Sequence, residues 1–287
     1  MLWRGRRQSS NVEDRRGVSG KGIAVGGGLG AVIIAVIMYL MGGDPSQALN
    51  MDPSSQTQQA APLTPAEDEA GQFTAVVLAD TEDIWTKLFS EMNRQYVAPR
   101  LVLFTQSTQS GCGFASQATG PFYCPGDSKV YIDLSFFNEM KQRFNAAGDF
   151  AQAYVIAHEV GHHVQHLLGI TDKVDAQRGR ISKTEMNRLS VKLELQADFL
   201  AGVWAHYEAM KTDPQMNTSV IEAGDIEEAL NAANAIGDDR LQQQSQGYVV
   251  PDAFTHGTSA QRIAWFKKGY QTGDMRQADT FNDPSLN

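Results

Sequence analysis

Three residues in the segment AQAYVIAHEVGHHVQHLLG, 151–169, have the types and spacing of a metal site. His158 and His162 are four positions apart, so on an α-helix both imidazoles project from one face, about one turn apart. That separation lets both bind one zinc ion at ~2.0–2.1 Å. Glu159 does not share their direction and can accept a proton from a water molecule that the metal activates. This HExxH pattern predicts metal-dependent hydrolysis.

The residues inside and beside the pattern are mostly small or apolar. A helix with such flanks is expected to be buried, and ionisable groups are costly there unless they have a partner. The alternative, a His-rich helix on the surface, would have charged flanks. The flanking residues in question are Ile156, Ala157, Val160, Gly161 and Val164.

Two more histidines lie on the same predicted helix. His163 is expected to face away from the metal, whereas His166 continues the stripe of the two predicted ligands at the next i+4 step and could touch the site. The longer pattern HExxHxxGxxH would need a glycine at Gln165 and a histidine at Leu168. The third ligand must therefore come from another element.

The best candidate for that ligand is in LSVKLELQADFLAGVWA, 189–205. Glu194 and Asp198 are four apart among apolar residues, where acids are costly unless they are paired or bind metal. Glu194 would complete a His₂Glu set with one open position, and Asp198 would hydrogen-bond a ligand imidazole. The alternative is an ion pair of Glu194 with Lys192 or Arg188, although neither spacing sets two side chains next to each other on a helix.

Charge and hydropathy divide the chain unevenly. Its net charge of −9 argues against a nucleic-acid-binding surface, yet residues 1–21 carry six basic residues and only two acidic ones. Residues 22–41 have no charge, and a helix over them would be roughly 30 Å long, enough to cross a bilayer. The alternative, a cleaved signal peptide, usually has a shorter basic region and a shorter apolar run.

We therefore expect four regions. Residues 1–21 form a basic cytoplasmic head, 22–42 a transmembrane helix, 43–72 a flexible linker rich in Gln, Ser and Pro, and 73–287 the metallopeptidase domain. With that domain outside the cytoplasm, Cys112 and Cys124 are expected to form a disulfide, the alternative being two free buried thiols.

Periodicity, caps and β-branched runs place the elements that hold the site. Short strands followed by many helices indicate an α+β domain with a small sheet. Strands are expected over 100–105 and 129–134, and helices over 73–93, 135–144, 149–168, 182–210, 225–246 and 258–270.

At this point the chain resembles a known family. HEVGH followed by ELQAD looks like the gluzincin pattern, and GPFYCP, VYIDLSFF, AYVIAHEVGHHVQ, LELQADFLAGVWA and THGTSAQRIAWFKKGY resemble the bacterial putative neutral zinc metallopeptidase family, as does WRGRRQSSNVEDRRG followed by one apolar span. The resemblance implies a zincin-like, minigluzincin fold with a small sheet, the HExxH helix and a further helix that carries the Glu. It also implies a single-pass protein of the bacterial inner membrane, with the N-terminus cytoplasmic and the catalytic domain periplasmic.

The same resemblance assigns further roles. HGTSAQR, 256–262, is similar to an HPxxxxR segment of membrane gluzincins, so His256 would hydrogen-bond the oxyanion and Arg262 would orient Asp198 or Glu194. Gly257 replaces the proline of that segment, and the alternative for His256 is a loop or cap residue. Tyr154 and Tyr207 are fallback oxyanion donors or ordinary core tyrosines.

Extended substrate pairs with an edge strand in zincin-like folds, so the resemblance assigns that role to the predicted strand before the HExxH helix. Its residues are Val130, Tyr131, Ile132, Asp133 and Leu134.

The sequence as a whole predicts a membrane-anchored endopeptidase with Zn²⁺ as cofactor and a peptide or protein as substrate. Two alternatives stay open. One is a metal-binding module without turnover that is tethered for partner binding, although Glu159 as a base argues against it. The other is hydrolysis of a non-peptide amide. The sequence predicts no nucleic-acid partner and does not determine an oligomeric state.

Overall fold

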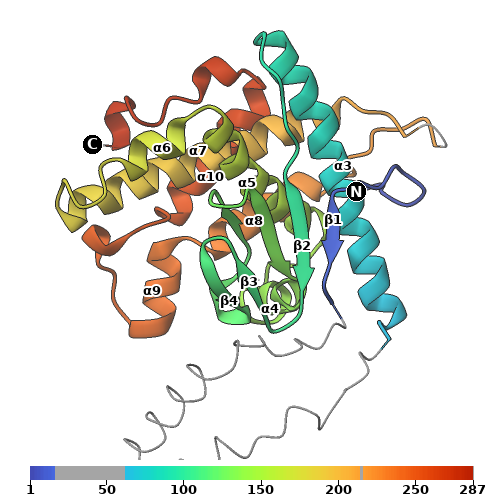
Figure 1. The fold of residues 1–287 in the computed structure, drawn as a ribbon, viewed down its shortest axis with the longest axis horizontal. Coiled ribbons are helices and arrows are strands. Elements are labelled where there is room, and N and C mark those ends of the chain that lie inside the picture. The colour runs from blue at the N-terminus through green and yellow to red at the C-terminus, as the bar shows by residue number, and fades with distance from the viewer. Residues whose placement is uncertain (17–61, 214–215, 287) are drawn as a thin grey trace, which may run out of the picture.

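The computed structural model describes residues 1–16, 62–213 and 216–286 (Figure 1). A four-stranded sheet has the order β1-β2-β6-β5, with β1, β2 and β6 parallel and β5 antiparallel to β6. A separate hairpin pairs β3 with β4. The strands are β1 (Val12–Asp14), β2 (Arg100–Phe104), β3 (Ser107–Ser110), β4 (Gly113–Ser116), β5 (Phe122–Cys124) and β6 (Lys129–Asp133).

Helices make up most of the rest of the described chain. Helices α3, α7 and α10 begin at capping boxes, in which a Thr or Ser side chain and a Glu or Gln three residues later satisfy free backbone N–H groups: Thr64 with Glu67, Ser182 with Glu185 and Thr258 with Gln261. The α-helices are α3 (Pro65–Glu91), α4 (Ser135–Arg143), α5 (Asp149–Leu167), α6 (Ile170–Asp175), α7 (Lys183–Ala209), α8 (Asp225–Ala235), α9 (Asp238–Gln246) and α10 (Ser259–Thr272). Short 3₁₀ turns are η1 (Gln117–Thr119), η2 (Pro251–Ala253), η3 (Met275–Gln277) and η4 (Pro284–Leu286).

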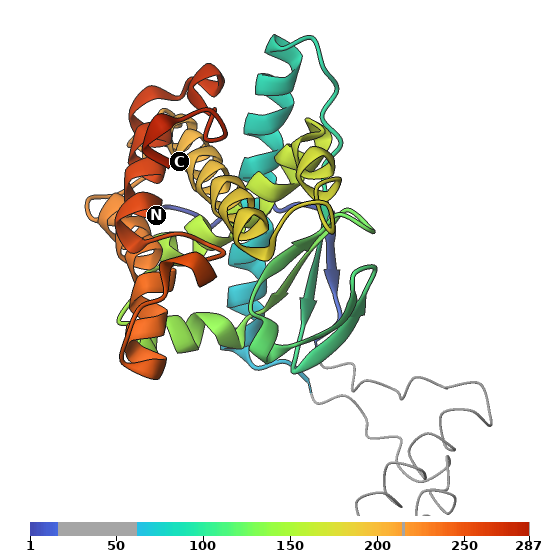
Figure 2. The ribbon, with the colours of Figure 1, turned by 90° about the vertical axis from the view of Figure 1, so that its left-hand side faces the viewer.

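The sheet packs one face against the helices (Figure 2). Alternate strand residues point to opposite faces. Leu101 and Leu103 of β2 therefore join the main core with α3, α5, α7, α8 and α10, whereas Val102 and Phe104 join a smaller cluster on the other face. Helix α5 contacts β5 and β6 of the sheet as well as α7 and α8, so the HExxH segment lies in the interior.

Helices α7 and α10 cross in close contact at two glycines. A Cβ at Gly202 would lie 2.1 Å from the Phe266 carbonyl oxygen, and a Cβ at Gly269 would lie 2.1 Å from the Phe199 carbonyl oxygen. Only glycine permits this approach, which sets Arg262 of α10 beside Asp198 of α7.

The N-terminal residues belong to the folded body, contrary to the sequence-based prediction of a separate head. β1 forms a parallel ladder with β2, and Arg6 pairs with buried Asp80 and Glu208 at 2.6 and 2.8 Å. A chain that crosses a bilayer once has its two flanks on opposite sides, whereas here residues 1–16 and 62–213 share one sheet. The predicted single-pass topology, with a cytoplasmic N-terminus and a periplasmic catalytic domain, is therefore wrong.

The predicted fold class, an α+β domain preceded by a transmembrane helix, also needs correction. The structure is a mixed helical fold with small sheets, and none of its described helices has the length and apolar character that a membrane span requires. The predicted span over 22–42 lies outside the described residues, as does most of the predicted linker. The remainder of that linker, from Pro65, is already the first turns of α3.

Two element predictions also need correction. The helix predicted over 225–246 is two helices, α8 and α9, because Gly237 between them has an extended backbone (φ −70°, ψ 142°) that interrupts the helical hydrogen bonds. The predicted substrate strand is not an edge: β6 pairs with β2 on one side and β5 on the other, so its backbone groups are already used. In the described sheet, β5 is the edge strand on this side.

Candidate metal centre

Helix α5 places the HExxH residues in the interior. His158 and Glu159 are 6% and 7% exposed, and His162 is partly buried one turn later. A Cβ at Gly161 would come within 3.1 Å of the Ala197 carbonyl oxygen of α7. The glycine therefore lets α7 approach closely enough for one of its side chains to reach both imidazoles.

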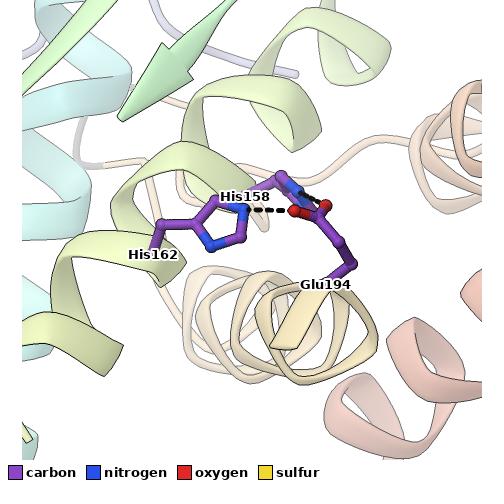
Figure 3. A group of neighbouring side chains, drawn as sticks. All are labelled: His158, His162 and Glu194. Atoms are coloured by element: carbon purple, nitrogen blue, oxygen red, sulfur yellow. Dashed lines mark hydrogen bonds and ion pairs between the residues drawn. The ribbon is translucent and has the colours of Figure 1, made fainter. Parts of the chain in front are cut away.

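That side chain is Glu194. Its two carboxylate oxygens lie 3.2 Å from His158 Nε2 and 3.3 Å from His162 Nε2 (Figure 3). One ligand atom from each of the three residues lies within 4.8 Å of the other two. The ion pairs considered as an alternative are not formed, since Arg188 pairs with Asp252 and Lys192 Nζ donates to the Phe281 carbonyl.

The hydrogen bonds of the two Nδ1 atoms, those of His158 and His162, show whether these two histidines and Glu194 fit a metal ion. His158 Nδ1 lies 2.9 Å from Asp198 Oδ1, and His162 Nδ1 lies 2.9 Å from Gln165 Oε1. With each Nδ1–H donated to such an acceptor, Nε2 keeps its lone pair for a metal, an arrangement usual for zinc-binding histidines. Two imidazoles and one carboxylate, with a cleft beside them, fit a zinc site with an open position.

The charges of the three groups are strongly coupled. Burial disfavours the Glu194 carboxylate, but the His162 charge and hydrogen bonds from both imidazoles hold its pKa well below the usual value. Burial likewise opposes protonation of His158, but the charge and hydrogen bond of Asp198 raise the pKa of that imidazole to about 10. The surrounding carboxylates therefore favour positive charge at this site. Protons on the imidazoles or a metal ion can supply it.

Asp198 accepts hydrogen bonds from several buried side chains behind His158. Arg262 Nε donates to Asp198 Oδ2 at 2.9 Å and Arg262 Nη2 donates to Oδ1 at 3.0 Å. Tyr154 also donates its hydroxyl proton to Oδ1, at 2.5 Å. Asp198 is fully buried, and Arg262 is 2% exposed. The carboxylate therefore stays ionised and keeps the His158 ring in one orientation.

The site opens into a cleft of about 540 Å³. Glu159 lines it next to the three converging residues, and among the described residues its carboxylate accepts no hydrogen bond. Phe122 and Tyr123 of the edge strand β5 form another part of the lining. A free carboxylate, a metal-binding group and an edge strand thus share one cleft.

His256 also lines the cleft, with half of its side chain exposed. Asp238 accepts from the backbone N–H of His256 at 2.6 Å and lies 3.2 Å from its Nδ1. Burial opposes protonation of the ring, but the hydrogen bond to Asp238 and the charge of Glu194 give a net rise in its pKa. When this ring is protonated and its Nδ1–H is held by Asp238, its Nε2–H remains a donor.

The remaining histidines of α5 serve a different contact. His163 Nε2 donates to the Val97 carbonyl at 2.7 Å, and burial lowers the pKa of this ring to about 4, so it is neutral and its Nδ1 accepts. The Tyr123 hydroxyl donates to that Nδ1 at 3.0 Å and accepts from His166 Nδ1 at 2.7 Å. His166 is therefore engaged with Tyr123, and the network attaches β5 to α5.

Other predicted residues are placed as follows. Tyr154 already donates to Asp198 and is fully buried, which removes it as an oxyanion donor. Tyr207 does not line the cleft and packs under Lys87. Cys112 and Cys124 form the predicted disulfide, which joins the β3–β4 hairpin to the end of β5.

Sequence reasoning missed two polar contacts. Asp238 lies 18 positions before His256, and the only available signal was its place at the start of a helix after a glycine. Gln165 was considered solely as a departure from HExxHxxGxxH. Its position three residues after a predicted ligand on the same helix could have marked it as a partner of His162.

Comparisons with known proteins show what the chain as a whole is similar to. A family model described as "Putative neutral zinc metallopeptidase" matches residues 1–281. A protein of Escherichia coli (strain K12), "Uncharacterized protein YpfJ", is 52% identical over 291 residues, which cover 98% of this chain and 99% of that protein. "Uncharacterized protein Rv2575" of Mycobacterium tuberculosis (strain ATCC 25618 / H37Rv) is 40% identical over 258 residues, 86% of each chain. No solved structure matches the chain.

Proposed function

Since the chain belongs to the putative neutral zinc metallopeptidase family, we propose that it is a zinc-dependent endopeptidase that hydrolyses peptide bonds in the described cleft. One observation carries the proposal: His158, His162 and Glu194 converge beside the Glu159 carboxylate, which is free to act as a base. A purely structural zinc site has four closed ligands and no such base.

The residues of the chain have separate tasks in this proposal. His158, His162 and Glu194 would hold the zinc ion, which would polarise a substrate carbonyl and lower the pKa of a water molecule. Glu159 accepts the proton of the attacking water and delivers it to the leaving amine nitrogen. Asp198 and Arg262 act behind His158 and keep its Nε2 directed at the cleft.

His256 is proposed to stabilise the oxyanion that forms on the substrate carbonyl. Asp238 holds its Nδ1, so the Nε2–H of the imidazolium is the group left to donate. Removal of one such donor in other enzymes lowers the rate about 10²- to 10³-fold. We therefore assign His256 to transition-state binding and Asp238 to positioning His256.

The substrate is proposed to add an extended strand to β5 rather than to β6. β5 pairs with β6 along one side only in the described sheet, and Phe122 and Tyr123 line the cleft. Backbone hydrogen bonds to an edge strand are independent of side-chain identity, which suits a peptidase that accepts several sequences.

The test is Glu159→Gln in the zinc-loaded protein. An unfolded protein mixture and a casein-type substrate serve as probes, with zinc content measured in parallel. We expect zinc to be retained and cleavage to fall about 10²- to 10⁴-fold, because only the proton acceptor is lost. The matched control is Glu227→Gln, an exposed glutamate on α8, which should cleave like the wild type.

Three outcomes would count against the proposal. Cleavage that persists in Glu159→Gln would exclude the mechanism. A wild-type protein that binds zinc but cleaves no protein or peptide would favour a metal-binding module, and cleavage confined to small non-peptide amides would change the substrate class.

A further inference from the structure

A chain of amide groups runs from the second predicted metal ligand to the C-terminal segment. Gln165 Oε1 lies 2.9 Å from His162 Nδ1, and Gln165 Nε2 lies 3.1 Å from Gln196 Oε1. Gln196 Nε2 in turn donates to the Ala278 carbonyl at 2.7 Å. Gln165 is fully buried and Gln196 is 4% exposed, so water does not substitute for these contacts.

Backbone carbonyls determine the direction of every bond in this chain. The Leu193 carbonyl oxygen can only accept, and Gln165 lies 2.7 Å from it. The Gln165 atom at that contact must therefore be the NH₂ nitrogen, which leaves its oxygen for His162. The Ala278 carbonyl orients Gln196 in the same way, so that the oxygen of Gln196 faces the NH₂ group of Gln165.

The orientation of the Gln165 amide determines the tautomer of His162. Because the Gln165 oxygen can only accept, His162 Nδ1 must carry a proton, and the lone pair for a metal is on Nε2. Leu193 immediately precedes Glu194, so the carbonyl that orients Gln165 belongs to the backbone that carries the third ligand. The side-chain amide of Gln165 therefore fixes the position of the second ligand, His162, relative to the third, Glu194.

The C-terminal segment, Met275–Phe281, is anchored to α7 by further hydrogen bonds. Thr280 Oγ1 donates to the Lys192 carbonyl at 2.6 Å, and Lys192 Nζ donates to the Phe281 carbonyl at 3.2 Å. Thr280 is fully buried. The segment therefore fixes Gln196 from the side opposite to Gln165.

We propose that Gln165 and Gln196 are positioning residues of the metal centre, through which Leu193 and the C-terminal segment hold the His162 imidazole in its metal-binding tautomer. The inference rests on the proposed zinc site and adds the structural part that orients its second histidine. Asp198 and Arg262 orient the first histidine with charges, whereas neutral amides orient the second.

The experiment measures the zinc dissociation constant by chelator competition, together with the visible absorption spectrum of the cobalt(II)-substituted protein. Gln165→Met keeps the volume and removes the acceptor, so zinc affinity should fall about 10- to 100-fold and the cobalt bands should shift. Gln152→Met is the matched control, since Gln152 lies on the same helix outside the amide chain and should leave both readouts unchanged.

Two further variants test the connection to the C-terminal segment. Gln196→Met should weaken zinc binding less than Gln165→Met does, because Leu193 still holds Gln165. In a double-mutant cycle the two losses should be less than additive, since both act through the same amide. Thr280→Val, which releases the segment from Lys192, should reduce zinc affinity in the same direction as Gln196→Met.

The outcomes separate this inference from the proposed function. Wild-type zinc affinity and an unchanged cobalt spectrum in a folded Gln165→Met protein would overturn the positioning role while leaving the peptidase proposal intact. If Gln165→Met fails to fold, strictly additive losses or none in Gln196→Met and Thr280→Val would overturn the role instead. Absence of zinc binding by the wild type would contradict the proposed function itself.

Discussion

At the residue scale, the two predicted histidine ligands are oriented by opposite kinds of partner. His158 faces an ionised carboxylate that Arg262 neutralises, and His162 faces the oxygen of an uncharged amide. A carboxylate partner makes an imidazole a stronger ligand, whereas an amide fixes its tautomer with little change in charge. The two positions should therefore respond differently to mutation.

The first residue-scale prediction concerns Asp198→Asn. The asparagine leaves the Arg262 charge buried without its counter-charge, which typically costs about 3–5 kcal/mol of unfolding free energy. Zinc affinity should also fall about 10- to 100-fold. Denaturant unfolding and chelator competition measure the two effects. Asp83→Asn breaks an exposed pair with Arg7 and should change stability by less than about 1 kcal/mol, so equal effects would contradict the prediction.

The second residue-scale prediction concerns the pH dependence of zinc affinity. His158 has its pKa raised from 6.5 to about 10 by Asp198, against the opposing effect of burial, so it is protonated at neutral pH before a metal binds. Zinc displaces that proton, and zinc affinity should therefore rise as pH increases from about 6 to about 9. Titration calorimetry in buffers of different ionisation enthalpy should show proton release. A binding enthalpy that is the same in every buffer would refute the prediction.

Residue spacing on a single helix was enough to bring His158, Glu159 and His162 together, and the cost of burying Glu194 and Asp198 among apolar residues indicated a second helix. The structure also brings Arg262 to Asp198, as the resemblance implied. Gln165 and Asp238 could not be predicted in the same way. Their roles depend on which backbone groups of other elements face them, and helical periodicity does not contain that information.

At the element scale, helices were easier to predict than strands. Apolar periodicity and the residues at helix ends located α5, α7 and α10 to within two residues at either end, because both signals are local. β1 and β5 have three residues each, too few for a periodic signal. β6 was found, but its place inside the sheet depends on partners distant in sequence, and this is why it was wrongly expected to be an edge strand.

The element-scale prediction is Gly269→Ala. The added methyl group would overlap the backbone of α7 at Phe199 and push α10 away, which should lower the free energy of unfolding by about 1–3 kcal/mol or more. Because α10 carries Arg262, zinc affinity should fall as well. Ala264→Ser, on the exposed side of α10, should alter neither quantity. A Gly269→Ala protein as stable as the wild type would contradict the close crossing.

At the scale of the whole molecule, the N-terminal residues are structural parts of the body. The positive charge of residues 1–21 favoured a head on the far side of a membrane. In the structure Arg4, Arg6 and Arg7 instead pair with acids of α3 and α7, including Asp80 and Glu208. Composition alone did not distinguish these two uses of the same charges.

The molecule-scale prediction uses a protease cut. A recognition sequence for a site-specific protease is inserted within 17–61 and cleaved under native conditions. The small N-terminal fragment should stay bound to the remainder during size-exclusion chromatography, because β1 pairs with β2 and Arg6 is held by two buried acids. It should separate only in denaturant. Separation after cleavage alone would show that the sheet does not depend on β1 pairing.

The pairing of β1 also has a consequence for how the chain is made. Arg15, directly after β1, donates to Thr108, 93 positions later, and the β1–β2 ladder has a similar span. During synthesis the first strand leaves the ribosome long before its partner exists, at about 5–20 residues per second. The nascent chain must wait several seconds with an unpaired strand and several arginines exposed. This interval, rather than the finished protein, is the stage at which a chaperone has most to protect.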